Sequence, residues 1–385
     1  MKIKKIEAEK IKDSRGKPTI KAIVECEDGS VGSFAVPSGA STGTHEAHVL
    51  DVQEACASVN DTIAKALIGM DVTAQKELDQ KMLELDGTQQ KSNLGGNAMI
   101  GVSIALAKAA AVVSGVPLYQ YLRTLRSIKP SRTVPMLFMN VINGGKHAKG
   151  GPAFQEYHII PDTDDVAEAK KIGEEFMLAL DQYASGMGDE GGIIVRTDDP
   201  EEPLRIIKSL GTSVKIGLDV AASSFYDKET NLYRCGDRDR TPSEMHELYG
   251  ELIKKYNLYS VEDPFQEEAF DDFALLQKNT DSIIIGDDLT VTNVSRLNTA
   301  IKAGAIRAMI IKPNQIGTLT ETLNTMELAR THDIHCIVSH RSGDTLDSAI
   351  ADIAYAFGTL GLKCGVPRQP ERVAKIDRLI QISHE

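Results

Sequence analysis

Residues 258–287 decide the fold, and they read LYSVEDPFQEEAFDDFALLQKNTDSIIIGD. Two short apolar runs, at 258–262 and 283–287, flank a helical pattern at 269–278, and each run ends on an acidic residue. This order predicts two parallel strands joined by a crossover helix, because a tight turn cannot join parallel neighbours.

The same unit recurs along the chain after residue 130. The predicted strands are 136–141, 156–160, 214–219, 258–262, 283–287, 309–312, 336–340 and 362–363. The predicted helices are 242–256, 269–278, 294–303, 320–331, 345–357 and 371–382. About eight strands indicate a closed α/β barrel of the (β/α)8 type over residues 130–385. The alternative, a doubly wound open sheet, usually has GxGxxG after its first strand, and none follows the first strand here.

The first part of the chain, residues 1–125, has a different pattern. Residues 1–35 read as strands with a hairpin turn at 27–29, and residues 46–123 read as helices. Between them, 36–43 (VPSGASTG) is small, polar and rich in glycine, so we expect a mobile loop. We therefore expect a smaller α+β domain that caps the barrel.

Composition excludes several classes of function. A net charge of −12 disfavours nucleic acid as a partner. We expect that no apolar run is long enough to span a membrane. The basic start lacks an apolar export segment, so a cytoplasmic location is expected. Five scattered cysteines without CxxC spacing indicate reduced thiols and no zinc site.

Ionisable residues end six successive predicted strands. Alone, such an acid is usually a helix cap and such a lysine a surface residue. Six in register predict one site at one end of the barrel, because buried like charges need a compensating ligand. These residues are Asp219, Glu262, Asp287, Lys312, His340 and Lys363.

The types of residue in this set point to a particular chemistry. Asp219, Glu262 and Asp287 form a hard oxygen ligand set that suits Mg²⁺. Lys312 and Lys363 lie beside it, and a lysine near a cation and away from bulk water has a lowered pKa and can act as a base. The combination suits removal of a proton next to a carboxylate.

Other candidates are weak when taken alone. Glu190 lies in a glycine-flanked segment, 188–192, which could equally be a surface turn. Gln155 and Glu156 at a strand start carry no signal of their own. Segment 340–342 offers three donors suited to phosphate.

Long motifs in order along nearly the whole chain resemble those of the enolase family. They are SRGKPT (14–19), VPSGASTG (36–43), LDGT (85–88), NGGKHA (143–148), GDEGG (188–192), SVEDPF (260–265), KPNQIGT (312–318) and SHRSG (339–343). The resemblance implies dehydration of 2-phosphoglycerate to phosphoenolpyruvate, a small phosphorylated carboxylic acid, with Mg²⁺ as cofactor.

The resemblance also implies a role for each site residue. Lys312 would take the C2 proton, and Glu190, with Glu156 beside it, would assist loss of the hydroxyl group. The implied metal ligands are Asp219, Glu262 and Asp287 for a first Mg²⁺ and Ser41 for a second. The implied substrate contacts are Arg341 and Ser342 to the phosphate, Lys363 to the carboxylate, and His147, Gln155 and His340 around the pocket.

The chain departs from the family pattern in loops near the site. Asp344 and Leu346 stand where two glutamates are usual, and 369–370 reads Gln-Pro in place of Arg-Ser. Two alternatives therefore stay open: a relative that dehydrates another phosphorylated or phosphonate hydroxy acid, or a non-catalytic binding protein on the same scaffold. Retention of the two lysines and Glu190 counts against the second.

A further departure concerns association between subunits. Enolases pair a glutamate and an arginine across their dimer contact, and the corresponding positions here are Lys21 and Gln381. We expect a homo-oligomer in which this contact is remodelled or weaker.

Overall fold

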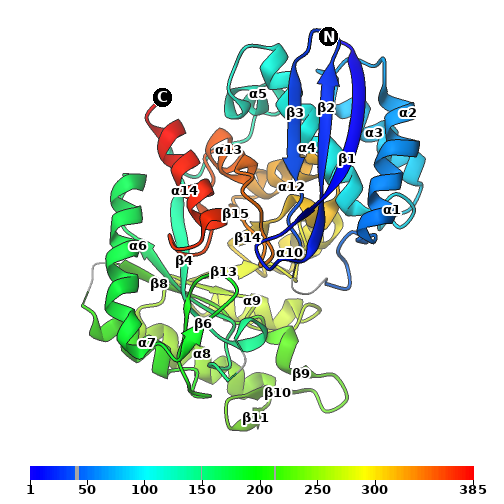
Figure 1. Ribbon diagram of the computed structural model, residues 1–385. Helices are drawn as coiled ribbons and strands as arrows, with labels where there is room; N and C mark the ends of the chain where they lie inside the picture. The colour runs from blue at the N-terminus through cyan, green and yellow to red at the C-terminus, as the bar shows by residue number, and fades with distance from the viewer. Residues whose placement is uncertain (40–42, 149, 212–213) are drawn as a thin grey trace.

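The computed structural model describes residues 1–39, 43–148, 150–211 and 214–385, except for the side chain of His147. The expected mobile loop therefore lies partly, at 40–42, outside the described residues. The chain forms an N-terminal unit, blue and cyan in Figure 1, on a barrel coloured green to red. The fold class predicted from the sequence is confirmed.

The N-terminal unit is a three-stranded antiparallel sheet covered by helices. Strands β1 (Ile3–Lys12), β2 (Pro18–Cys26) and β3 (Val31–Ala35) pair in chain order. The helices are α1 (Val52–Ala57), η1 (Ser58–Ile63), α2 (Ala64–Leu67), α3 (Gln75–Asp86), α4 (Gly96–Val113) and α5 (Leu118–Leu125).

Helix α4 corrects one expectation from the sequence. It is long and apolar enough to cross a membrane, with a mean hydropathy of 1.6 over 18 residues, although we expected no such run. However, 83% of these residues are buried, because α4 is the core helix of the unit. It packs so closely on β3 that a Cβ at Gly32 would lie 2.2 Å from Ala105 O.

Eight strands close the barrel. Their order is β4-β5-β8-β12-β13-β14-β15-β16, and β16 pairs back to β4. Their bounds are β4 (Met136–Asn143), β5 (Glu156–Pro161), β8 (Val214–Asp219), β12 (Ser260–Glu262), β13 (Ile283–Gly286), β14 (Ala308–Ile311), β15 (His335–Ser339) and β16 (Gly361–Lys363). All eight strands were predicted to within a few residues.

One strand, β5, runs against the others, although the sequence analysis expected a parallel sheet. It is antiparallel to both β4 and β8. The register places Glu156, the first residue of β5, opposite Asp219, the last residue of β8. A residue at the start of one strand thus lies at the same end of the barrel as the last residue of its neighbour.

Helices surround the barrel, and their bounds are α6 (Val166–Leu180), α7 (Glu202–Ser209), α8 (Pro242–Tyr256), α9 (Phe270–Lys278), α10 (Val294–Ala303), α12 (Leu319–Thr331), α13 (Ala349–Ala356) and α14 (Pro370–Ser383). Local sequence sets their starts: Thr241 and Glu244 form a capping box for α8, and Asn293 caps α10.

Shorter elements complete the unit. Strands β6 (Gly186–Met187) and β7 (Ile193–Ile194) extend the sheet beside β4, and β9 (Tyr226–Asp227), β10 (Leu232–Cys235) and β11 (Arg238–Arg240) form a small separate sheet. The single turns are η2 (Gly145–His147), η3 (Asp181–Tyr183), η4 (Ala222–Phe225) and α11 (Pro313–Ile316).

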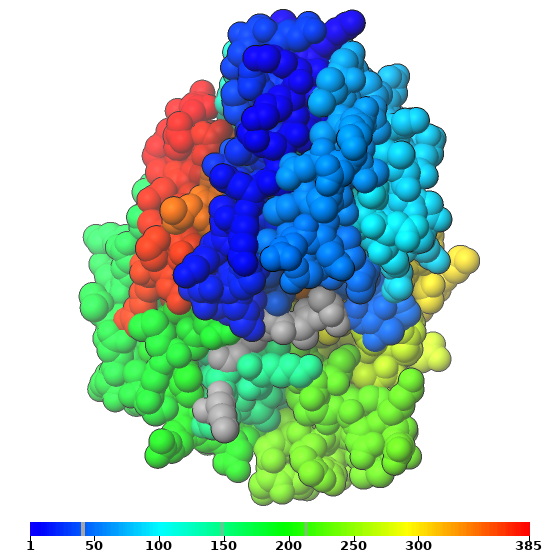
Figure 2. All heavy atoms as spheres, turned by 45° about the vertical axis from the view of Figure 1, so that its right-hand side comes forward, coloured from blue at the N-terminus to red at the C-terminus, as the bar shows by residue number. Residues whose placement is uncertain are grey.

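The two units share polar contacts at their junction. Asp79 of α3 is fully buried and accepts hydrogen bonds from the backbone and hydroxyl of Thr320, at 2.9 and 2.6 Å. Lys108 of α4 pairs with Asp347 at 2.6 Å. Figure 2 shows the N-terminal unit, in blue and cyan, seated above the green part of the barrel.

Candidate active site

A cavity of about 200 Å³ opens at the carboxyl ends of the barrel strands, where the N-terminal unit meets the barrel. Ten of the predicted site residues line it: Gln155, Glu156, Glu190, Asp219, Asp287, Lys312, His340, Arg341, Ser342 and Lys363. Residues from seven barrel strands or the loops after them thus meet at one face, as the register of ionisable residues predicted.

Lys363 is the centre of a buried acidic cluster. Its Nζ lies 2.8 Å from Asp219, 2.9 Å from Glu262 and 3.1 Å from Glu156. Burial favours the neutral amine, but the three carboxylates outweigh it and raise the pKa of Lys363. Burial, and then the nearby Asp219, raise the pKa of Glu262 well above its ordinary range. The carboxylates therefore surround one position that takes a positive charge.

Lys312 forms a second pair, with Asp287. Burial acts to lower the pKa of Lys312, but Asp287 outweighs it, so that the pKa is raised. The same contact holds the pKa of Asp287 below its ordinary value, although burial opposes this. Because Asp287 faces the amine directly, the protein groups raise the pKa of Lys312, whereas the lowered pKa predicted from the sequence is that of a lysine beside a bound cation.

Asp263 and Asp288 belong to the site but were missed from the sequence. Ligand oxygens of Asp263, Asp287 and Asp288 lie within 4.8 Å of one another. Burial, and then Asp287, raise the pKa of Asp288 to about 7. Asp263 accepts the backbone N–H groups of Asp287 and Asp288, at 2.9 and 2.7 Å. Asp263 stood inside the motif SVEDPF, and both residues directly follow a predicted ligand, Glu262 or Asp287.

Glu190 is held on a tight loop by close backbone packing. Asn140 Nδ2 donates to Glu190 Oε2 at 3.0 Å, and His340 Nε2 lies 3.4 Å from the same oxygen. A Cβ at Gly188 or Gly192 would lie 2.5 Å from the side chain of Asn143. The glycines therefore allow the loop to pack directly against β4. Glu190 is buried, so this segment is not the surface turn that the sequence left as an alternative.

Glu156 has a buried histidine as its neighbour. His158 Nε2 lies 2.8 Å from Glu156 Oε2, and both side chains are buried. Burial, and then the charge of Lys363, lower the pKa of His158 to about 3. His158 thus stays neutral, and can donate one hydrogen bond to Glu156 without adding charge.

Arg341 and Ser342, the predicted phosphate contacts, both touch the N-terminal unit. Arg341 lies 3.1 and 3.3 Å from the two carboxylate oxygens of Glu46, and it donates to Asn314 at 3.1 Å. Arg15 Nη1 lies 3.4 Å from Ser342 Oγ. Glu46 was missed because nothing in the local sequence shows that a residue so distant would meet Arg341.

Two predicted site residues are not placed. Ser41 lies outside the described residues. His147 ends the turn η2, but its side chain is not described. Both side chains are therefore outside what the structure describes, and their roles stay predictions.

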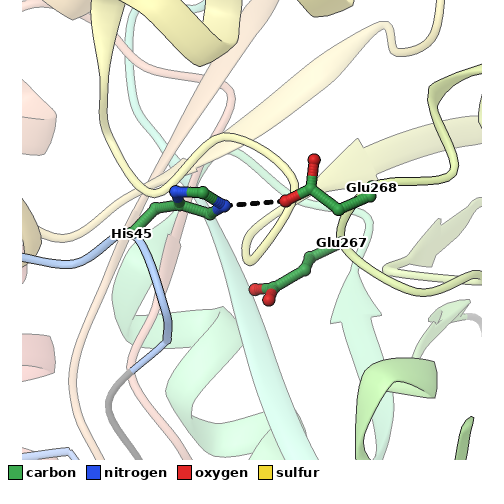
Figure 3. A group of neighbouring side chains, drawn as sticks. All are labelled: His45, Glu267 and Glu268. Carbon is green, nitrogen blue, oxygen red and sulfur yellow. Dashed lines mark hydrogen bonds and ion pairs between the residues drawn. The ribbon is translucent and has the colours of Figure 1, made fainter. Parts of the chain in front are cut away.

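A third acidic group lies at the rim of the cavity (Figure 3). His45 Nε2 points at Glu268 Oε1, 2.7 Å away, with Glu267 beside the pair. Thr44 donates to Glu267 at 3.0 Å. These contacts fasten the segment after residue 42 to the loop after β12.

Comparisons with known proteins match both units of the chain to one family. The family description "Enolase, C-terminal TIM barrel domain" matches residues 131–385, and "Enolase, N-terminal domain" matches residues 3–122. A protein named Enolase from Methanopyrus kandleri is 42% identical over 100% of this chain and 96% of its own length. Proteins of the same name from Methanosarcina barkeri and Bifidobacterium longum subsp. infantis are 42% and 40% identical, over 100% of this chain and 95% and 94% of theirs.

Proposed function

The chain belongs to the enolase family of hydro-lyases, and from that premise we propose that it dehydrates 2-phosphoglycerate to phosphoenolpyruvate. The observation that supports this most is that one cavity is lined by an amine, an acid and a guanidinium group. These are Lys312, Glu190 and Arg341. A base, an acid and an anion-binding group are the parts that loss of water from a phosphorylated hydroxy acid needs.

The donor set fits a divalent cation. Asp219 and Glu262 already converge on the ammonium of Lys363, and Asp287 lies within the group of three aspartates. Carboxylate oxygens in this number suit Mg²⁺, and we assign Asp219, Glu262 and Asp287 as its ligands, with Ser41 for a second ion. When bound, Mg²⁺ stabilises negative charge on the substrate carboxylate.

Lys312 is the proposed base for the C2 proton. It can accept a proton only when Asp287 no longer holds its ammonium form, and Asp287 is one of the carboxylates assigned to the metal. Glu190, oriented by Asn140, is the proposed acid for the leaving hydroxyl group, with Glu156 beside it. Burial of these groups strengthens their electrostatic effects, because bulk water no longer screens them.

Arg341 and Ser342 are the proposed phosphate contacts. A guanidinium donates in a planar fork, which suits phosphate oxygens. Lys363 is the proposed partner of the substrate carboxylate, and His147, Gln155 and His340 complete the pocket. Glu46 forms a two-point contact with Arg341, so the incoming phosphate must share or replace a carboxylate.

A turnover assay tests the proposal. We expect the protein with Mg²⁺ to form phosphoenolpyruvate from 2-phosphoglycerate, seen as a rise in ultraviolet absorbance. Turnover of a phosphonate or another phosphorylated hydroxy acid, but not of 2-phosphoglycerate, would point to the first alternative substrate class. No turnover of either compound would leave a binding role on this scaffold.

Three further predictions are proposals of the same kind. We propose a capping domain at residues 1–125 and a barrel domain at 130–385. We propose a cytoplasmic homo-oligomer with no nucleic-acid or membrane partner. Its dimer contact would be altered at Lys21, which lies 3.8 Å from Glu9 of its own chain, and at Gln381, which accepts from Arg378.

A further inference from the structure

Arg372 is a large buried side chain that the proposed reaction does not use. It lies in the first turn of α14, and none of its surface is exposed. Burying a guanidinium costs free energy unless its N–H groups are hydrogen-bonded. The hydrogen-bond partners of Arg372 therefore indicate which segments it positions.

Apart from Gln369 just before α14, whose Oε1 accepts from Arg372 Nε at 3.3 Å, the hydrogen-bond partners of Arg372 belong to the two loops that carry the proposed acid and the proposed phosphate contacts. Its Nη1 lies 2.7 Å from both His340 Nδ1 and the carbonyl oxygen of Arg341. Its Nη2 donates to the carbonyl oxygen of Ser342 at 2.8 Å, and lies 3.5 Å from that of Asp189. One side chain therefore links the residue before Glu190 to the segment that follows β15.

The contact with His340 decides where the imidazole carries its proton. Arginine only donates hydrogen bonds, so Nδ1 of His340 must be the acceptor. A neutral imidazole with an accepting Nδ1 carries its proton on Nε2. That nitrogen is buried, lies 3.4 Å from Glu190 Oε2, and makes no hydrogen bond with the residues that the structure describes.

We propose that Arg372 is a positioning residue that holds His340 in the Nε2–H tautomer, so that His340 offers one hydrogen-bond donor to the cavity beside Glu190. The inference rests on the proposed function in one respect, because the donor is useful only to a substrate or acid in that cavity. The tautomer itself follows from the contact between Arg372 and His340.

The charges around His340 agree with a neutral ring. Burial is the main cause that lowers the pKa of His340 to about 4. Glu190 acts in the opposite direction from the glycine loop, Arg372 lowers the pKa from α14, and Asp344 raises it from the loop after β15. The ring therefore remains neutral at physiological pH, where the position of a single proton decides what it can donate.

A merely structural role is the competing explanation, and Lys375 provides the matched control. Lys375 is also on α14 and almost fully buried, and it pairs with Asp344 at 2.9 Å, as Arg372 does at 3.5 Å. Lys375 donates to the carbonyl of Thr345, and no described contact joins it to His340. Replacing it removes a buried charge of the same helix but leaves the tautomer of His340 in place.

The first test needs no substitution at Arg372. In ¹⁵N-histidine NMR spectra of the full chain, with His340 assigned by the loss of its signals in His340→Gln, we expect a protonated Nε2 and an unprotonated Nδ1. A proton on Nδ1 of His340 in the unsubstituted protein overturns the proposal. This result stands apart from catalysis: absence of 2-phosphoglycerate turnover would overturn the proposed function and leave the tautomer measurement valid.

The second test compares Arg372→Met with Lys375→Met. For Arg372→Met we expect a mixed or doubly protonated His340 in the NMR spectrum. We also expect a fall in kcat of about 10- to 100-fold, the size of loss seen when the hydrogen-bond partner that orients a metal-ligating histidine is removed. Lys375→Met should keep the His340 tautomer and most of kcat, even if its Tm falls as much as that of Arg372→Met. Equal loss of kcat in both variants with an unchanged His340 spectrum overturns the proposal.

Discussion

Glu46 and Arg341 come from different units of the chain and form a buried ion pair across the junction, with oxygen–nitrogen distances of 3.1 and 3.3 Å. The guanidinium proposed to bind phosphate is thus already bound to an anion of the protein. The Glu46–Arg341 pair should therefore affect both the free energy of unfolding and the affinity of the site for phosphate, and both quantities can be measured.

Replacing Glu46 by glutamine should therefore have two opposite effects. Leaving Arg341 buried with a neutral partner should lower the free energy of unfolding by about 3 kcal/mol, typical of a broken buried pair. Removing the competing carboxylate should strengthen binding of inorganic phosphate. Chemical unfolding and calorimetric titration measure the two effects. Glu7→Gln, in an exposed pair with Lys5, is the control and should change neither. Weaker phosphate binding in Glu46→Gln would show that Glu46 instead prepares Arg341 for the ligand.

Replacing Lys312 by alanine should lower kcat by at least about two orders of magnitude, because a positioned base contributes that much. The ultraviolet assay for phosphoenolpyruvate measures the loss. Lys302→Ala, on the exposed end of α10, controls for the loss of a lysine elsewhere on the barrel. An Lys312→Ala variant that retains normal turnover would remove Lys312 from the role of base.

Mg²⁺ should stabilise the folded protein, and chelation should abolish turnover. A ligand present at a hundred times its Kd raises the free energy of unfolding by about 2.7 kcal/mol, so Tm should rise on adding Mg²⁺. Asp219→Asn should lose this rise in Tm, because it removes an assigned ligand. Glu268→Gln, in the rim group of Figure 3, should keep it. A Tm response that disappears in Glu268→Gln and persists in Asp219→Asn would place the ion at the rim.

His158 should make the protein less stable as the pH falls. Its pKa is about 3 in the folded protein, against an ordinary value of 6.5, so the unfolded chain binds its proton first. Its contribution to stability is present above pH 6.5 and decreases as the pH falls toward 3, by about 1.4 kcal/mol per pH unit. Chemical unfolding of His158→Gln over this range should show a correspondingly weaker pH dependence. The control variant His384→Gln changes an exposed histidine and should show the same pH dependence as the unsubstituted protein. If His158→Gln also showed that same pH dependence, His158 would not be the group responsible.

Association between subunits should be weak and should respond to a pair of substitutions. Lys21 and Gln381 have partners within their own chain, so neither offers the acid–base pair that joins subunits in the family. We expect sedimentation velocity to show dissociation at micromolar concentration, and the double variant Lys21→Glu with Gln381→Arg to associate more tightly than either single variant. A tight dimer of the unsubstituted chain would reject this prediction.

The barrel strands were the elements predicted best from the sequence, because each strand is marked by its own local pattern of residues. Runs such as that of β14 (Ala308–Ile311) are short and apolar, and an ionisable residue at or just after the end of each run marks the end of the barrel that holds the site. The predicted Mg²⁺ ligands Asp219, Glu262 and Asp287 followed from residue type at these strand ends, whereas Ser41 and the separate substrate contacts came from the family motifs.

The direction of β5 could not be read from its composition, because a buried strand has the same pattern in either orientation. A signal was present in the connection: residues 144–155 are too few for the usual helical crossover, and the short helix η2 is what the structure describes there. Glu46 and Arg372 were missed for a different reason. Their importance lies in partners that are far away in the chain, and a single sequence does not record such contacts.

The antiparallel direction of β5 changes which loops of the barrel can be altered without affecting the site. In a parallel barrel the segments that precede strands can vary in length without disturbing chemistry. Here the segment that precedes β5 emerges at the reactive end and aligns Glu156 with Asp219, whereas the segment after Pro161 emerges opposite Val214, at the distant end. Loop grafting or directed evolution aimed at new substrates would therefore find its most direct access in residues 144–155, and a safe attachment point for tags or fusions in the turn that follows Pro161.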